Sequence, residues 1–117
     1  MLKKDNRLKK RYQFNYVYKS GEHFSGRALV LYTTPSRTKS IKVGFAVTKK
    51  IGHAVVRNKT KRQLREIVKK YLPNLKQNYN IIVVAKDNIL DFDFSQLEND
   101  FVKLINKAEL VYVEKDN

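Results

Sequence analysis

The stretch that organises this chain is Thr48–Tyr71, which reads TKKIGHAVVRNKTKRQLREIVKKY. Its second half carries apolar side chains at the i, i+3, i+4, i+7, i+8 spacing of a helix with one buried face. This apolar stripe consists of Leu64, Ile67, Val68, Tyr71 and Leu72. A step of ~100° per residue gathers polar and mostly basic side chains on one flank of the stripe. These flanking side chains are Asn58, Lys61, Arg62, Arg65 and Lys69, whereas Lys59, Glu66 and Lys70 point to the far side.

The charge of the whole chain favours a polyanionic partner for this helix. The 117 residues include 25 Lys and Arg against 11 Asp and Glu, a formal net charge of +14. A basic helical face is most often solvated surface. The mutual repulsion of so many positive charges would nevertheless be relieved by a partner with dense negative charge. Nucleic acid is the leading candidate for this partner, and an anionic membrane is the second. The planar guanidinium groups of arginines, held at fixed spacing on a helix, can donate paired hydrogen bonds to the phosphates of a folded nucleic acid.

Length and composition predict a single domain, residues 1–117, with no catalytic site formed by its own side chains. The length allows one core, and the absence of cysteine excludes disulfides and thiolate ligands. No signal peptide or membrane-length apolar run is visible, so we expect a cytoplasmic protein. His23 and His53 are the only histidines and lack metal-binding spacing. A metal-independent nuclease could still use a histidine with a lysine, but we favour the interpretation that both histidines are bystanders. We therefore expect no catalytic residue and no protein metal site.

The N-terminal half predicts a basic arm, a short helix and two strands. The arm, about residues 1–11, has few apolar anchors, and we expect it to be mobile when the protein is alone. A helix follows over Tyr12–Gly21, ending at its glycine, with Phe14, Val17 and Tyr18 on one face. Either these three side chains simply dock the helix on a sheet, or Tyr18 lies at a half-open cleft where it can stack on a base.

Phe24–Thr34 and Ile41–Thr48 have the pattern of strands joined by a polar turn, which predicts an antiparallel hairpin. Both faces of the first strand are apolar, so we expect helices on both sides of the sheet. Tyr32 then looks toward the same cleft as Tyr18. The run Asn80–Ala85 predicts a buried central strand, and the order strand, helix, strand implies that this strand is parallel to Ile41–Thr48.

The C-terminal part predicts a final helix that opens with a capping box over Ser95–Glu98. Its apolar face consists of Leu97, Phe101, Leu104, Ile105 and Ala108. Carboxylates cluster before and within this helix: Asp87, Asp91, Asp93, Glu98 and Asp100. A hydrated magnesium site is one interpretation of the carboxylates. We favour the other, that negative charge stabilises a helix N-terminus.

Taken together, these residues and their spacing resemble a known family, the protein subunit of bacterial ribonuclease P. The resemblance rests on Arg57-Asn58-Lys59-x-x-Arg62-x-x-Arg65 and its lead-in Val47–Val55, with further matches along nearly the whole chain. These matches are Arg7-Leu8, Phe14, Val17, Gly21, Val30–Tyr32 and Ile82–Ala85. Lys59 stands where the motif usually has Arg, which would turn a bidentate contact into a point contact.

The resemblance implies an α+β fold, built as an α/β sandwich with a central mixed four-stranded sheet and about three helices. It also implies that the basic helix lies in a left-handed crossover, although about 98% of parallel crossovers are right-handed. The catalyst would be a large RNA that removes the 5′ leader of precursor tRNA with magnesium-activated water. Mg²⁺ would be held mainly by that RNA and the substrate. The chain would be an enzyme only as the protein component of this endoribonuclease, aiding substrate and magnesium binding.

By the same resemblance, two sets of residues would contact RNA. The set that would bind the RNA subunit is Arg57, Asn58, Lys59, Lys61, Arg62, Arg65 and Lys69. The set that would bind the precursor-tRNA leader is Phe14, Val17, Tyr18, Tyr32 and Lys86. Two alternatives stay open from the residues alone: a non-enzymatic RNA-binding protein, and a binder of anionic surfaces that acts through charge only.

Overall fold

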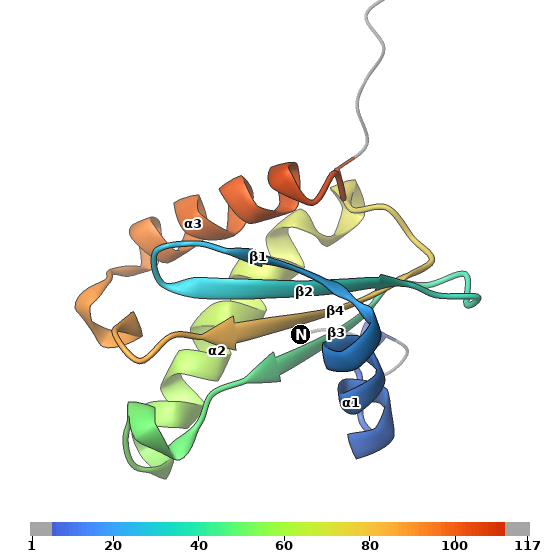
Figure 1. The fold of residues 1–117 in the computed structure, drawn as a ribbon. Helices are drawn as coiled ribbons and strands as arrows, with labels where there is room; N and C mark the ends of the chain where they lie inside the picture. Colours follow the sequence, from blue (N-terminus) through green and yellow to red (C-terminus); the bar gives the residue numbers. More distant parts are fainter. Residues whose placement is uncertain (1–5, 112–117) are drawn as a thin grey trace, which may run out of the picture.

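The fold is built around a four-stranded sheet with the order β1-β2-β4-β3 (Figure 1). The structure is a computed structural model, and it describes residues 6–111. The strands are β1 (Glu22–Ser25), β2 (Leu29–Pro35), β3 (Lys42–Ala46) and β4 (Tyr79–Ala85). The α-helices are α1 (Arg11–Ser20), α2 (Ala54–Tyr71) and α3 (Phe94–Lys107), and the short 3-10 turns are η2 (Lys49–Ile51), η3 (Leu72–Asn74) and η4 (Ile89–Asp91). The predicted sandwich with a mixed sheet and three helices is confirmed.

The strand β4 is the centre of the sheet, as its apolar run predicts. It pairs antiparallel with β2 and parallel with β3. At Ile82 the ladder joins all three strands, because this residue lies opposite Tyr32 of β2 and Gly44 of β3. The parallel pair and its α2 crossover are therefore confirmed, and the hand of the crossover stays a prediction.

The predicted hairpin between Phe24–Thr34 and Ile41–Thr48 is wrong. β4 lies between β2 and β3, and the hairpin is formed instead by β1 and β2. The first predicted strand covers the second half of β1 and nearly all of β2. The physical reason is that an apolar strand such as β4 needs partners on both edges for its backbone groups. The chain also turns sharply between Ser25 and Leu29, which breaks the run of strand-forming residues.

A buried carboxylate holds the turn between β1 and β2. Asp100 of α3 accepts hydrogen bonds from the backbone N–H groups of Arg27, Ala28 and Leu29, at 2.9, 3.0 and 3.0 Å. Gly26 is required beside it, because a Cβ there would lie 2.5 Å from Oδ1 of Asp100. The carboxylate and the glycine together explain why one apparent strand becomes two.

Helices cover both faces of the sheet, as predicted, but unequally (Figure 1). α2 and α3 pack on one face and close the main core, which includes Leu31, Ile81, Val83, Leu64 and Phe101. On the other face, α1 covers a smaller cluster built from the buried Leu8, Val17 and Ile82 and the half-buried Phe14, Tyr32, Ala46 and Val84. This second face therefore keeps partly exposed sheet residues beside α1.

A close approach fixes α1 on the sheet. The ring of Phe14 lies over Gly44 of β3, where a Cβ would be 2.5 Å from two ring carbons. The helix ends close to the predicted position, and the N–H of Gly21 donates to the carbonyl oxygen of Val17 at 2.8 Å. Any side chain at Gly44 would therefore push α1 away from the sheet.

The described part of the predicted arm is not free. Leu8 is buried and its N–H donates to the carbonyl oxygen of Val43 at 3.0 Å, while the Asn6 amide donates to Ile41 at 2.7 Å. This segment runs along the outer edge of β3. Residues 1–5 of the predicted arm lie outside the described range.

The final helix begins earlier than predicted. Its capping box is formed by Asp93 and Gln96 instead of Ser95 and Glu98: Asp93 accepts from the Gln96 N–H at 2.8 Å, and Gln96 accepts from the Asp93 N–H at 2.9 Å. Asp93 thus places a negative charge at the N-terminus of α3, which is the interpretation that we favoured for the carboxylates around this helix. The predicted apolar face is confirmed, since Leu97, Phe101, Leu104 and Ile105 are buried and Ala108 packs against the core. Within residues 6–111 no helix is long and apolar enough to cross a membrane.

Candidate nucleic-acid interface

The helix α2 buries its predicted apolar stripe. Leu64, Ile67 and Val68 are each 1% exposed, and Tyr71 and Leu72 pack against the core. The sequence pattern missed Thr60, which lies one turn before Leu64 and is buried on the same face. Its hydroxyl is satisfied there, because it donates to the carbonyl oxygen of Val56 at 3.0 Å. The stripe holds the rest of the helix rigidly against the sheet.

The flank beside this stripe forms a basic surface. Its exposed members are Asn58, Arg62, Arg65 and Lys69, and its half-buried members are Arg57 and Lys61. In the described part of the chain, no carboxylate pairs with the cations of this surface. The structure therefore brings together all the residues predicted for RNA-subunit binding except Lys59.

Arg57 differs from the other cations because its side chain is partly packed into the protein. Its Nε is buried and has no hydrogen-bond partner within the described chain. A buried donor without an acceptor costs about 1–3 kcal/mol. The Arg57 side chain is therefore held partly within the protein, unlike the exposed Arg62 and Arg65.

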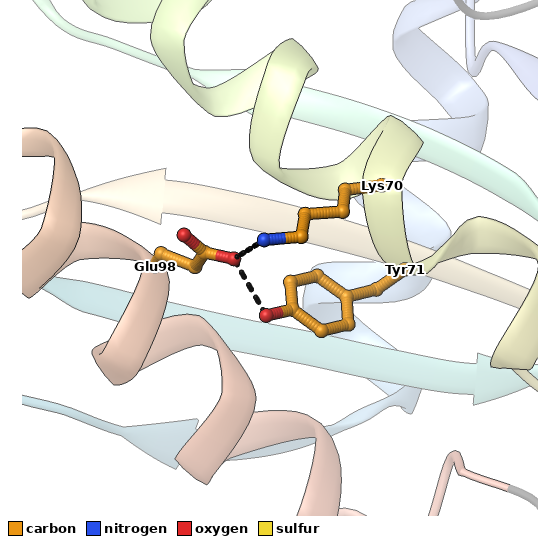
Figure 2. Close-up of polar contacts among 3 residues, drawn as sticks. All are labelled: Lys70, Tyr71 and Glu98. Carbon is orange, nitrogen blue, oxygen red and sulfur yellow. Dashed lines mark hydrogen bonds and ion pairs between the residues drawn. The ribbon is translucent and has the colours of Figure 1, made fainter.

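The far flank of α2 is partly occupied by contacts within the protein. Lys70 and Tyr71 both donate to Oε2 of Glu98 in α3, at 2.7 and 2.6 Å (Figure 2). These hydrogen bonds lower the pKa of the Glu98 carboxyl and raise the pKa values of the Lys70 ammonium and the Tyr71 phenol. Lys59 is exposed on this same flank, by helical spacing, and so lies apart from the basic surface.

An aromatic cluster of Tyr18, Tyr32 and His23 lies on the opposite face of the sheet. The rings of Tyr18 and Tyr32 meet edge to face, with centroids 4.9 Å apart and planes at 84°. Tyr18 is 38% exposed, and burial, followed by the neighbouring Tyr32, raises the pKa of its phenol. The predicted proximity of these two tyrosines, which come from α1 and β2, is therefore present in the structure.

The other residues predicted for leader binding lie at different depths and distances. Phe14 is half-buried over Gly44, and Val17 is fully buried, so Val17 supports the surface from beneath and has no exposed side chain to contact a ligand. Lys86 follows the end of β4, four residues beyond Ile82, the residue opposite Tyr32. That spacing is roughly 13 Å along a strand. The Lys86 ammonium donates to the carbonyl oxygen of Gly26.

His23 and Gly44 are the two residues of this region that sequence reasoning missed. His23 stands directly opposite Tyr32 in the ladder of β1 and β2. Only the correct hairpin would have placed it there, because the predicted pairing of Phe24–Thr34 with the next strand leaves His23 outside the sheet. The signal for Gly44 was a glycine within a strand pattern, which often marks a close approach.

Three acids at the start of and within α3 make structural contacts. Asp93 caps α3, Glu98 binds Lys70 and Tyr71, and Asp100 holds the turn before β2. Within residues 6–111 no group of three or more acidic, histidine or cysteine side chains is arranged to hold a metal ion.

The fold and these surfaces define a small basic protein of the α/β-sandwich class, with cations displayed along one helix. The chain belongs to the Ribonuclease P family, whose model matches residues 2–109. The ribonuclease P protein components of Caldanaerobacter subterraneus subsp. tengcongensis and Symbiobacterium thermophilum are 38% and 39% identical to it, covering 99% and 97% of this chain and 99% of each relative.

Solved structures agree with this family. The RNase P protein of Staphylococcus aureus has a TM-score of 0.85 and 31% identity, covering 92% of this chain and 98% of that chain. The RNase P protein of Thermotoga maritima, at 24% identity and a TM-score of 0.78 over 86% of this chain and 96% of that chain, shows the shared fold. The chain is accordingly a protein component of ribonuclease P, a tRNA-processing ribonuclease in which such a protein pairs with an RNA subunit.

Proposed function

We propose that this chain binds the catalytic RNA subunit through the basic surface and the single-stranded 5′ leader of precursor tRNA through the aromatic cluster. The observation that carries this proposal is the placement of two chemically different surfaces on elements that cover opposite faces of one sheet. The cleavage itself would be the work of the RNA. We also expect the cytoplasm as the compartment, because the RNA subunit and precursor tRNA are made there.

The basic surface suits a folded RNA. Within residues 6–111 its cations have no carboxylate partner, so their charge is available to displace the counterions that surround RNA phosphates. Arg62 and Arg65 extend from a helix whose opposite face is buried, which fixes the spacing of their planar donors. A folded RNA presents phosphates at equally fixed spacing, and the match favours it over a flexible polyanion.

The aromatic cluster suits unpaired bases. Single-stranded RNA is recognised largely by stacking of splayed bases on aromatic rings, with cations along the backbone. Tyr18 offers an exposed ring, and half-buried Val30 and Val84 continue the same face of the sheet toward Lys86. Magnesium, held by the RNA subunit and the substrate, would supply the activated water. This chain would contribute by holding the leader and neutralising phosphates near that site.

The RNA-subunit interface is tested with two double variants that make the same change in net charge at different places on the protein. We expect Arg62→Glu with Arg65→Glu to weaken binding of the RNA subunit strongly and to reduce the salt dependence of that binding. The control is Lys103→Glu with Lys107→Glu, two exposed lysines on α3. If both double variants lose the same affinity, the chain acts through net charge alone and the proposed interface is wrong. The purified protein should cleave precursor tRNA only when the RNA subunit is added.

The leader interface is tested with substrates of increasing leader length. Loss of one stacked base costs about 1–3 kcal/mol, so Tyr18→Ala should lose about tenfold or more in affinity for substrates with a leader. Leaderless tRNA should bind the holoenzyme unchanged. Tyr16→Ala is the matched control, because Tyr16 is 58% exposed on the same helix but outside the aromatic cluster. Equal losses for the two variants would rule out a specific leader site at Tyr18.

A further inference from the structure

The ring of His23 extends the aromatic cluster from α1 and β2 onto the edge strand β1. His23 and Tyr32 are direct cross-strand partners, and their ring centroids are 5.6 Å apart with planes inclined by 32°. Tyr18 approaches the same Tyr32 ring edge-on from α1. Tyr32 therefore has an aromatic neighbour on two sides, and the two exposed rings of the cluster are those of Tyr18 and His23.

We propose that His23 is a further stacking position for a base of the single-stranded leader. This inference rests on the proposed leader site and names where that site continues. In it, Tyr32 is the half-buried central support, and bases stack at the two exposed ends of the cluster. The leader then passes from α1 over Tyr32 to β1, which is an edge of the sheet and has no further strand beside it in the described chain.

The geometry suits stacking better than a purely structural role. An exposed ring that is inclined by only 32° to the ring of Tyr32 can continue the stack to a base on its other side. An imidazole also has one nitrogen that donates and one that accepts when neutral, which allows a contact to a base edge. A side chain that served only the core would be buried, whereas His23 is exposed.

The test uses the holoenzyme reconstituted with its RNA subunit and precursor tRNAs of increasing leader length. We expect His23→Ala to lose about fivefold in affinity for long leaders, the lower end of what one stacked base contributes, and nothing for leaderless tRNA. His23→Phe keeps a ring and should retain most of the affinity. Because the ring lies at one end of the cluster, the loss should appear only once the leader is long enough to reach β1.

Parallel measurements with Tyr18→Ala separate this inference from the function on which it rests. If Tyr18→Ala loses leader-dependent affinity and His23→Ala does not, the leader site stands and the role of His23 is refuted. If neither variant changes binding at any leader length, the leader site itself is wrong. An equal loss by His23→Ala for leaderless and long-leader substrates would also refute stacking, since it would show an effect on the fold or on the RNA subunit.

Discussion

Replacing Asp100 by Asn would weaken the turn that separates β1 from β2. The side chain is 6% exposed, and its carboxylate accepts three backbone hydrogen bonds, from Arg27 on Oδ1 and from Ala28 and Leu29 on Oδ2. An amide has only one accepting oxygen. If that oxygen stays on Ala28 and Leu29, the new NH₂ group faces the N–H of Arg27, so two donors oppose each other.

The expected loss follows from these bonds. A hydrogen bond to a charged acceptor contributes about 1.5–3 kcal/mol, against about 1 kcal/mol for a neutral one. Asp100→Asn loses one such bond outright and weakens the other two, so the free energy of unfolding should fall by about 3 kcal/mol. For a domain of this size the melting temperature should fall by on the order of 10 °C.

Urea unfolding followed by circular dichroism measures this loss, because the slope of the transition reports whether only stability has changed. Asp87→Asn is the matched control: it removes the same charge from an exposed position. Exposed substitutions of this kind usually stay within about 0.5 kcal/mol. If the two variants unfold at the same urea concentration, the carboxylate does not hold the turn and the reasoning is refuted.

Two further perturbations test other contacts. The pKa of Glu98 is lowered from 4.5, the ordinary value for this carboxyl, so its hydrogen bonds to Lys70 and Tyr71 stabilise the fold fully above pH 4.5. This stabilisation is lost as the pH falls through the lowered pKa. At neutral pH the wild-type protein should therefore unfold at a higher urea concentration than Glu98→Gln. A difference between their midpoints that persists unchanged in acid would contradict this. Gly44→Ala places a Cβ 2.5 Å from the Phe14 ring, so we expect a loss of about 1–3 kcal/mol, again by urea unfolding. A wild-type midpoint would show that α1 tolerates the displacement.

Local patterns predict the elements of this protein better than their arrangement. The period of Leu64, Ile67 and Val68 determines which face of α2 is buried, and with it which cations are exposed. The order of the strands depends on partners far apart in the chain. Asp100 holds a turn more than 70 residues earlier, and no local feature of either segment indicates that contact.

The same distinction applies to the candidate site. The proximity of Tyr18 and Tyr32 follows from an amphipathic helix packed on a strand, which local spacing can indicate. The neighbour on the other side of Tyr32 is set by strand register, which the wrong hairpin concealed. His23 therefore had no visible role in the sequence, although the residue type was suited to one.

The central position of β4 ties the two proposed surfaces together. Ile82 lies opposite both Tyr32, within the aromatic cluster, and Gly44, on which Phe14 docks α1. The helix α2, which carries the basic surface, leaves β3 and returns into this same β4. The separation between the surfaces is thus set by one strand buried on both faces and hydrogen-bonded along both edges. Such a rigid support would hold the leader at a fixed distance from the bound RNA subunit, so the two could be engaged together without a change in the protein's conformation.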